Sequence, residues 1–334
     1  MISPGRNNFV GIWNWDSAFH AIGMLDFDKE LAKEQILGFL QFQLENGMLP
    51  DVIWESGVIE DNFSKPPVMA SAAEKVFHET GDYDFLKKVY PQLVFNANFW
   101  ERERMFGGLF HYDANQDKEN YLKWVGYETG WDNSPRWDKE PYNCWAIDLN
   151  CYMVMTYRSL AVMAEKLGED SKEWKIKETL LTSEIEKRLW NENLEAYTDY
   201  NFKKESFINV LSPASFMPLY VGIAPESRAE KMNQIAIDHF LPGMPTVAYD
   251  DPSYSREYWR GPCWLNVAFF AAKGLYDYGF IDSARTIKDT ILTWVENDGD
   301  YIHENYDAKT GEGLCYPEFS WSSVFVREFI KQIK

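Results

Sequence analysis

Cysteine is scarce in this sequence, and its four cysteines show no C-x-x-C spacing. In a chain of 334 residues this argues against a disulfide framework and favours reduced thiols in a cytoplasmic protein. Long apolar runs are also missing, because no stretch reaches the ~18 apolar residues of a membrane span and the first residues lack the apolar core of a signal peptide. We therefore expect no membrane association.

Basic residues are few as well. The chain has 33 Lys and Arg against 52 Asp and Glu, and its formal net charge is -19. A surface of this charge repels polyanions, since binding nucleic acid requires cations that neutralise phosphates. Nucleic acid and anionic lipid are therefore excluded as expected partners.

Aromatic residues, by contrast, are abundant. The sequence contains 14 Trp, 19 Tyr and 22 Phe, and 46% of its residues are hydrophobic. This composition fits one large core, and no linker, low-complexity segment or charge run marks an internal boundary. We expect a single domain over residues 1–334.

Helical periodicity dominates, and the predicted helices fall into pairs. The first member of each pair is largely apolar, and the second is amphipathic with Lys and Glu on one side. First members begin near Asp16, Pro66, Asp148, Pro213, Pro262 and Glu318, and second members near Asp28, Asp82, Asp170, Pro225 and Asp282. The pattern predicts an all-α fold, an (α/α)6 barrel that lacks one outer helix.

The loops between these helices have unequal lengths. Those within a pair are short, whereas those leading to the next pair run to about 20 residues or more. If the apolar helices form an inner ring, all the long loops emerge on one rim, where binding residues usually lie. Most of the tryptophans fall in these long connections, which predicts an aromatic rim.

One long loop contains the stretch ETGWDNSPRWD, in which Asp132 lies between Trp131 and Trp137. Desolvation by such neighbours favours a protonated carboxyl group, as a general acid requires. The alternatives are a solvated Asp in a capped turn, or Glu128 in the acid role.

The last long loop carries three more carboxylates, Glu304, Asp307 and Glu312. It emerges on the same predicted rim as Asp132, so two carboxyl groups could face each other as glycoside hydrolysis requires. Spacing alone does not choose among the three.

Two further rim segments are rich in groups that bind sugars. One holds Trp13, Trp15 and Asp16, and the other holds Trp259 and Arg260. Asp16 could instead cap a helix, and Arg260 could pair with a carboxylate of the rim.

Together these segments resemble the clan of inverting α-glycosidases formed by glycoside hydrolase family 63 and the family 37 trehalases. ETGWDNSPRWD is similar to the general-acid motif, with Asp132 as the acid, and HENYD is similar to the general-base segment, which selects Glu304. WDSAFH, YWRGPCW and FSW match further signatures in the same order. The resemblance implies an (α/α)6 barrel, inversion of configuration, and neither a catalytic metal nor a cofactor.

The resemblance also implies a substrate, a small α-glucoside or α-mannoside, and a substrate-binding set of Trp13, Trp15, Asp16, Lys65, Trp131, Arg136, Trp259, Arg260 and Trp321. In size the chain is similar to compact bacterial enzymes that hydrolyse mannosylglycerate or glucosylglycerate. It departs from the family pattern at Lys65, where a glutamine is usual, and a cation there suggests an anionic aglycone.

Three alternatives stay open: a trehalase-like enzyme, another (α/α)6 activity such as an epimerase or lyase, and a non-catalytic sugar-binding protein. Epimerases and lyases usually use His or Tyr as acid and base, and the five histidines form no obvious pair. Retention of both carboxylates argues against a non-catalytic protein. The sequence leaves the oligomeric state open.

Overall fold

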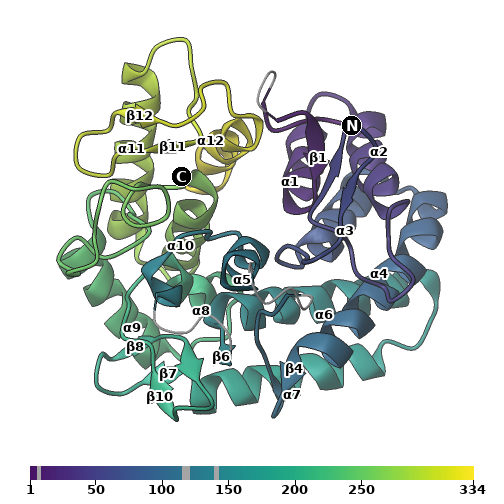
Figure 1. Ribbon diagram of the computed structural model, residues 1–334, viewed down its shortest axis with the longest axis horizontal. Helices are drawn as coiled ribbons and strands as arrows, with labels where there is room; N and C mark the ends of the chain where they lie inside the picture. The colour runs from purple at the N-terminus through teal and green to yellow at the C-terminus, as the bar shows by residue number, and fades with distance from the viewer. Residues whose placement is uncertain (6–8, 115–120, 139–142) are drawn as a thin grey trace. The chain divides into compact units, whose positions relative to one another are not determined.

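The computed structural model describes residues 1–5, 9–114, 121–138 and 143–334 (Figure 1). These residues are mostly helical, and each of their strands is only two or three residues long. They group into two compact units. Unit 1 comprises Met1–Gly130 and Leu149–Glu184, and unit 2 comprises Trp131–Asp148 and Ile185–Lys334. The assignment of residues 1–334 to a single domain stays a prediction.

Unit 1 is built mainly from paired helices and two small antiparallel sheets. Its helices are α1 (Asn14–Met24), α2 (Lys29–Leu40), α3 (Met69–Thr80), α4 (Tyr83–Arg104) and α5 (Tyr121–Thr129), and its strands are β1 (Gly11–Trp13), β2 (Val52–Trp54), β3 (Ile59–Glu60), β4 (Met105–Phe106) and β5 (Leu109–Phe110). The sheet order is β1-β2-β3, and β4 pairs with β5. Helices α6 (Ile147–Leu167) and α7 (Lys172–Arg188) each have one end in unit 2.

The two kinds of predicted helix differ in burial as their sequences require. Helix α1 is buried on nearly all sides, whereas α2 and α4 bury one face each. Helix α1 packs against both α2 and α3, and α2 also packs against α4. The side chains of Asp28 and Asp82 accept hydrogen bonds from Leu31 N and Phe85 N, both at 2.9 Å, and so cap α2 and α4 at their predicted starts.

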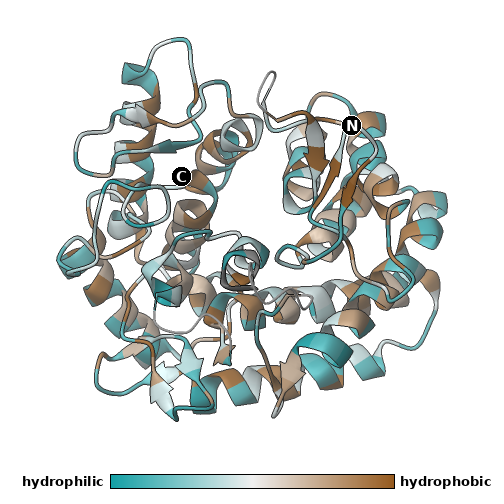
Figure 2. Ribbon diagram, in the orientation of Figure 1, coloured by the Kyte–Doolittle hydropathy of each residue, from teal (hydrophilic) through white to brown (hydrophobic). Residues whose placement is uncertain are grey.

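Unit 2 combines helices with short antiparallel strands in its long connections. Its helices are η1 (Pro135–Trp137), η2 (Pro213–Phe216), α8 (Met217–Tyr220), α9 (Glu226–Ile235), η3 (Ala236–Phe240), α10 (Leu265–Asp277), α11 (Ile281–Asn297) and α12 (Ser320–Gln332); its strands are β6 (Cys144–Trp145), β7 (Trp190–Asn191), β8 (Ala196–Tyr197), β9 (Tyr200–Asn201), β10 (Ser206–Phe207), β11 (Asn305–Tyr306) and β12 (Gly313–Leu314). Helix α10 is the central helix of this unit, since it packs against α8, α11 and α12. Figure 2 shows hydrophobic residues gathered along α10, which is buried over most of its length.

Every helix predicted from periodicity is present. The segment near Pro213 is the weakest, because it folds as the short η2 followed by one turn of α8. Helix α5 was missed, since it lies inside the long loop that precedes Asp132. All strand pairs among the described residues are antiparallel, and the strands form two sheets of three strands and three of two strands.

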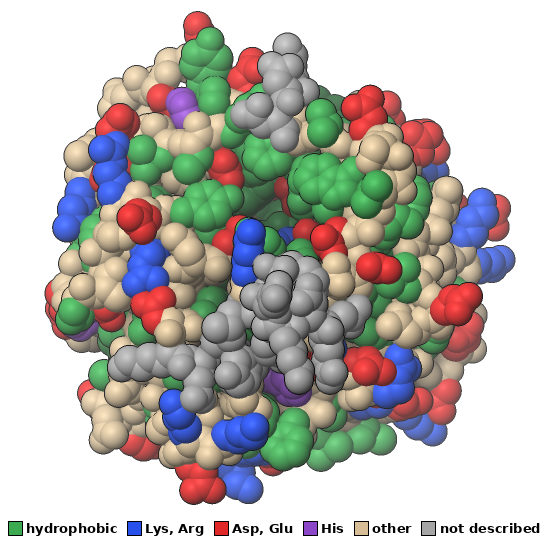
Figure 3. Space-filling model, in the orientation of Figure 1, with side chains coloured by type: hydrophobic (Ala, Val, Ile, Leu, Met, Phe, Trp, Pro, Cys, Tyr) green, Lys and Arg blue, Asp and Glu red, His purple; other side chains and the backbone are tan. Residues whose placement is uncertain are grey.

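The surface and the thiols also agree with the composition. Figure 3 shows acidic and basic side chains interspersed over the face in view, with no continuous basic patch among the described residues of that face. All four cysteines are free, and only Cys315 is exposed. Over the described ranges, no helix has the length and apolar character that crossing a membrane requires.

Candidate active site

The predicted acid and base both belong to unit 2. Asp132 lies between Trp131 and η1 and is half-buried. Glu304 immediately precedes β11, and only 4% of its surface is exposed. Its backbone N–H donates to Tyr316 O at 2.8 Å, which ties it to the segment that follows β12. The two loops predicted to carry the catalytic pair are therefore parts of one compact unit.

Glu304 has the environment of a proton acceptor. Burial raises the pKa of its carboxyl group to about 7, and the negative charge of Asp132 adds to this rise, while a hydrogen bond from Tyr258 opposes it. The Asp132 carboxylate is thus near enough to act on Glu304. A carboxyl group with a pKa near neutrality is suited to take up a proton at physiological pH.

Tyr258 was not predicted to contact the base. Its hydroxyl donates to Glu304 Oε1 at 2.8 Å, and burial, together with the charges of Glu304 and Asp132, raises the pKa of Tyr258. The hydroxyl therefore stays protonated and can only donate to a charged Glu304. Tyr258 has a positive φ of 45°, and its backbone carbonyl accepts a hydrogen bond from Trp264 Nε1 at 2.9 Å. This bond fixes the backbone from which the Tyr258 side chain reaches Glu304. The only signal in the sequence was its place at the start of YWRGPCW.

The other carboxylates considered for these roles have different surroundings. Glu128 is completely buried in unit 1 and accepts hydrogen bonds from Arg104 and from two backbone N–H groups. Asp307 pairs with Arg256 and accepts from two backbone N–H groups of its own turn. Glu312 is 62% exposed and also pairs with Arg256. These contacts give all three carboxylates a role in holding loops together.

Four indole rings of unit 2 form a row that begins at Trp131, the residue before Asp132. Trp131 packs on Trp259 with ring centroids 5.0 Å apart, Trp259 stacks on Trp264 at 3.8 Å, and Trp264 stacks on Trp321 at 5.7 Å. Each ring is at most 2% exposed. The rings pack on one another and are buried within unit 2. Direct contact of Trp131, Trp259 and Trp321 with a sugar stays a prediction.

Arg136 has an internal position that argues against direct contact with substrate. Only 1% of it is exposed, and its guanidinium donates to Asp148 at 2.9 and 3.0 Å and to Asp199 at 2.8 Å twice. It also lies over the rings of Trp131 and Trp137, with its central carbon 5.0 and 4.5 Å from their centroids. These buried ion pairs join the segment that carries Asp132 and Arg136 to Asp148 and to the distant loop of Asp199, and so fix its position.

Arg260 forms an ion pair with a carboxylate of the rim, the alternative to a role in binding substrate. It binds Asp138 through two hydrogen bonds of 2.7 Å and also donates to Asn133 O at 3.1 Å. The backbone N–H of Trp259 donates to Asn133 Oδ1 at 2.9 Å. These bonds join the loop of Asp132 to the loop of Tyr258, whose hydroxyl donates to Glu304, the predicted base.

The remaining predicted site residues lie in unit 1. Asp16 is 4% exposed in the first turn of α1, but Trp13 occupies the N-cap position, so Asp16 is not the cap. Trp15 is buried at 5%, and Trp13 packs edge-on against Trp54 with centroids 5.2 Å apart. Contact of Trp13, Trp15 and Asp16 with substrate stays a prediction.

Lys65 is held inside unit 1. Its ammonium donates to Tyr127 O and lies 3.5 Å from Asp51 Oδ1, and both charged side chains are only 9% exposed. The charge of Lys65 is therefore largely compensated before any ligand arrives. This weakens the expectation that Lys65 recognises an anionic aglycone.

A glycine of the acid motif meets a steric requirement. Gly130 has a φ of +73°, and a Cβ at this position would lie 2.5 Å from the ring of Trp15, also in unit 1. Only glycine combines this backbone conformation with such close approach to a ring. Glycine in this motif is therefore explained by packing against Trp15, independently of any catalytic role of Asp132.

No group of three or more metal-ligating side chains occurs among the residues that the structure describes. The absence of a metal from the reaction stays a prediction, which chelation can test.

Comparison with known proteins adds the following findings. The family model described as the mannosylglycerate hydrolase MGH1-like glycoside hydrolase domain matches residues 10–322. The mannosylglycerate hydrolase of Thermus thermophilus is 25% identical over 96% of this chain and 94% of its own length, and that of Rubrobacter radiotolerans is 23% identical over 98% and 92%. A periplasmic trehalase of Escherichia coli is 31% identical, with 96% and 66% covered.

Solved structures agree in fold. A glycoside hydrolase family 63 mannosylglycerate hydrolase from Thermus thermophilus in complex with glucose has a TM-score of 0.85 at 25% identity, with 98% of this chain and 94% of the other covered. A complex of that enzyme with Tris and D-glycerate gives a TM-score of 0.88 at 23% identity, over 99% and 96%. The two alignments with the mannosylglycerate hydrolases run over 408 and 420 positions, more than the 334 residues present, so those relatives carry insertions that this chain lacks.

Proposed function

We propose that this chain, which belongs to the mannosylglycerate hydrolase MGH1-like glycoside hydrolase family, hydrolyses a small α-mannoside or α-glucoside with inversion at the anomeric carbon. Asp132 acts as the general acid and Glu304 as the general base. The observation that carries the proposal is the buried Glu304 carboxyl group, with its pKa raised to about 7 and the charge of Asp132 acting on it.

The reaction needs one proton donor and one acceptor. Asp132 gives its proton to the glycosidic oxygen as the bond to the anomeric carbon breaks, while water attacks that carbon from the opposite side and loses a proton to Glu304. The oxygen of water becomes the new anomeric hydroxyl, and the aglycone leaves as an alcohol. Because a water must fit between base and sugar, the carboxyl groups should lie about 6.5–9.5 Å apart.

The printed names of the relatives, both mannosylglycerate hydrolases, support mannosylglycerate as the first candidate, and glucosylglycerate, which has the same aglycone, is tested beside it. The matching complex with glucose supports a site for a hexose. Trehalose is the second candidate, because a trehalase of Escherichia coli shares 31% identity. The fold likeness and the paired helices support an (α/α)6 barrel, which we propose lacks one outer helix and forms a single domain. A cytoplasmic location is proposed from the scarcity of cysteine, although the trehalase relative is periplasmic.

Turnover of these three sugars by the purified chain, followed by proton NMR, tests the proposal. The first product from an α-linked substrate should be the β-anomer, since a single displacement reverses the configuration. Initial appearance of the α-anomer would contradict inversion. An epimer or an unsaturated sugar as product would instead favour the epimerase or lyase alternative.

Substitution of the carboxyl groups tests the assignments. Asp132→Asn and Glu304→Gln should each lower kcat by at least ~100-fold, because each keeps the shape but removes a proton donor or acceptor. Glu312→Gln is the matched control, since Glu312 lies in the same loop as Glu304 and is exposed. Normal turnover by Glu304→Gln together with loss in Glu312→Gln would reassign the base.

Lys65→Gln tests recognition of the aglycone. If the ammonium contacts glycerate, KM should rise for glucosylglycerate and stay constant for trehalose, which carries no charge. An equal change for both sugars would mean that Lys65 only supports the packing of unit 1.

A further inference from the structure

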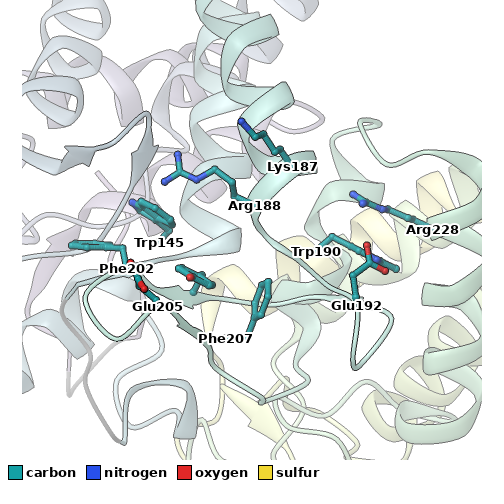
Figure 4. Close-up of a pocket in the computed structure, with 10 residues that line it drawn as sticks. Trp145, Lys187, Arg188, Trp190, Glu192, Phe202, Glu205, Phe207 and Arg228 are labelled. Atoms are coloured by element: carbon teal, nitrogen blue, oxygen red, sulfur yellow. The ribbon is translucent and has the colours of Figure 1, made fainter.

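Unit 2 contains a cavity that the proposed mechanism does not use. It has a volume of about 440 Å³ and lies between the C-terminal end of α7, the β6–β9–β10 sheet and β7 (Figure 4). We call it the α7 pocket. Its lining includes neither Asp132 nor Glu304. The volume falls within the range of small-molecule sites.

The strand register builds an aromatic floor in the α7 pocket. Trp145 is paired with Tyr200 across β6 and β9, and Tyr200 with Phe207 across β9 and β10. Directly paired residues project to the same face of a sheet, so the three rings form one row. Tyr200 stacks on Trp145 with centroids 5.6 Å apart and planes at 16°, and Phe207 meets Tyr200 edge-on at 5.0 Å. Phe202, Phe207 and Tyr200 are half-buried and keep ring surface open.

Charged groups of both signs surround this floor. In Figure 4 the side chains of Lys187 and Arg188 project from the end of α7 on the side of the pocket away from Phe207. The central carbon of the Arg188 guanidinium lies 3.7 Å from the centroid of Trp145, close enough for a cation–π contact that positions the guanidinium over the ring. Glu192 and Glu205 are exposed members of the lining. The pocket therefore offers hydrogen-bond donors and acceptors together.

The balance of charge argues against a polyanion as ligand. Arg228, the third cation of the lining, pairs with Glu186 at 2.8 Å, and Glu192 and Glu205 offset Lys187 and Arg188. A neutral ligand with many hydroxyl groups can use every group present. Hydroxyls accept from Arg188 and Lys187 and donate to Glu192 and Glu205, while the C–H face of a pyranose ring lies against the negative face of an aromatic ring.

We propose that the α7 pocket binds a neutral hexose unit at a site separate from the catalytic pair. The aromatic row supplies the stacking surface, and the end of α7 with the two glutamates supplies the hydrogen bonds. Such a site holds a sugar on the enzyme without cleaving it, because both glutamates of the described lining are exposed and neither has the buried setting of Glu304.

The test uses the full chain carrying Glu304→Gln, labelled with ¹⁵N, and D-mannose, D-glucose and inorganic phosphate as probes. The indole N–H signal of Trp145 is assigned by its loss in Trp145→Phe. Mannose or glucose should shift this signal in a saturable way, and phosphate should not. Saturation by phosphate alone would overturn the assignment to a neutral sugar.

Two variants separate the α7 pocket from the catalytic site. Phe207→Ala should weaken sugar binding at the Trp145 signal by about 2- to 10-fold, the range for loss of one aromatic contact. Glu205→Gln, an exposed change that leaves the fold intact, should weaken it several-fold. When they are made in the chain that retains Glu304, both variants should have the same kcat/KM for the cleaved glycoside as the unsubstituted chain.

The control is Phe106→Ala, which removes an exposed aromatic ring of unit 1 and should leave binding unchanged. If Phe207→Ala and Glu205→Gln both bind sugar normally, or if no sugar shifts the Trp145 signal, the α7 pocket is not a sugar site. These outcomes are independent of hydrolysis, which is measured with the unsubstituted chain.

Discussion

The hydrogen bond from Tyr258 to Glu304 provides a quantitative test of the active site. In Tyr258→Phe the ring remains and only the hydroxyl is lost, so Glu304 loses a donor that stabilises its charged form. If Glu304 is the proposed general base, it must be ionised to accept a proton from water, so its pKa should set the acidic limb of the kcat/KM profile. That limb should lie near pH 7 in the unsubstituted chain.

The size of the shift follows from the energy of the bond. A hydrogen bond to a charged group contributes about 1.5–3 kcal/mol, and about 1.36 kcal/mol corresponds to one pKa unit. Tyr258 is half-buried, so water replaces part of the lost donor, and we expect the pKa of Glu304 to rise by about one unit. At pH 7 the ionised fraction then falls from about one half to about one tenth, and kcat/KM falls about fivefold.

The assay is kcat/KM for the cleaved glycoside from about pH 5 to about pH 9, for Tyr258→Phe and for the control Tyr254→Phe. Tyr254 lies in the same loop, and among the described residues its hydroxyl has no hydrogen bond to Glu304. Activity of Tyr258→Phe should recover at the alkaline end of the range. A loss of the same factor at every pH, with no movement of the limb, would refute the role of Tyr258 as a donor that tunes the base.

Three further outcomes are expected. Arg136→Leu should lower the free energy of unfolding by about 3–5 kcal/mol in chemical denaturation, because it leaves two buried carboxylates without their cation, whereas Arg260→Leu, on a partly exposed pair, should cost under about 1 kcal/mol. Gly130→Ala should cost more than Gly81→Ala, since both have a positive φ of +73° and +66° but only Gly130 faces the ring of Trp15; equal losses would contradict the steric argument. Treatment with EDTA should leave turnover unchanged, and loss of activity restored by a divalent cation would contradict a metal-free mechanism.

Local features of the sequence were sufficient to predict the paired helices, though not α5, and the two loops that carry Asp132 and Glu304. Helix periodicity depends on which side of a helix meets the core, so α1 and α10 could be recognised as apolar and α2 and α11 as amphipathic. Capping is similarly local, because Asp28 lies only three residues from the N–H it accepts from. The resemblance then chose Glu304 among three carboxylates.

The chemical setting of these residues could be read only from the tertiary structure. The carboxylate partners of Arg136 are 12 and 63 residues away in sequence, and that of Arg260 is 122 residues away. No local pattern could therefore tell whether these arginines pair with carboxylates or bind a sugar. Tyr258 reaches Glu304 across 46 residues. The pKa of a buried carboxyl group depends on every atom that replaces water around it, and those atoms come from distant segments. The sequence by itself therefore determined the paired helices, the net negative charge and the candidate carboxylates. The fold decided which charged side chains pair with one another to hold loops in place and which carboxyl group is buried with a raised pKa.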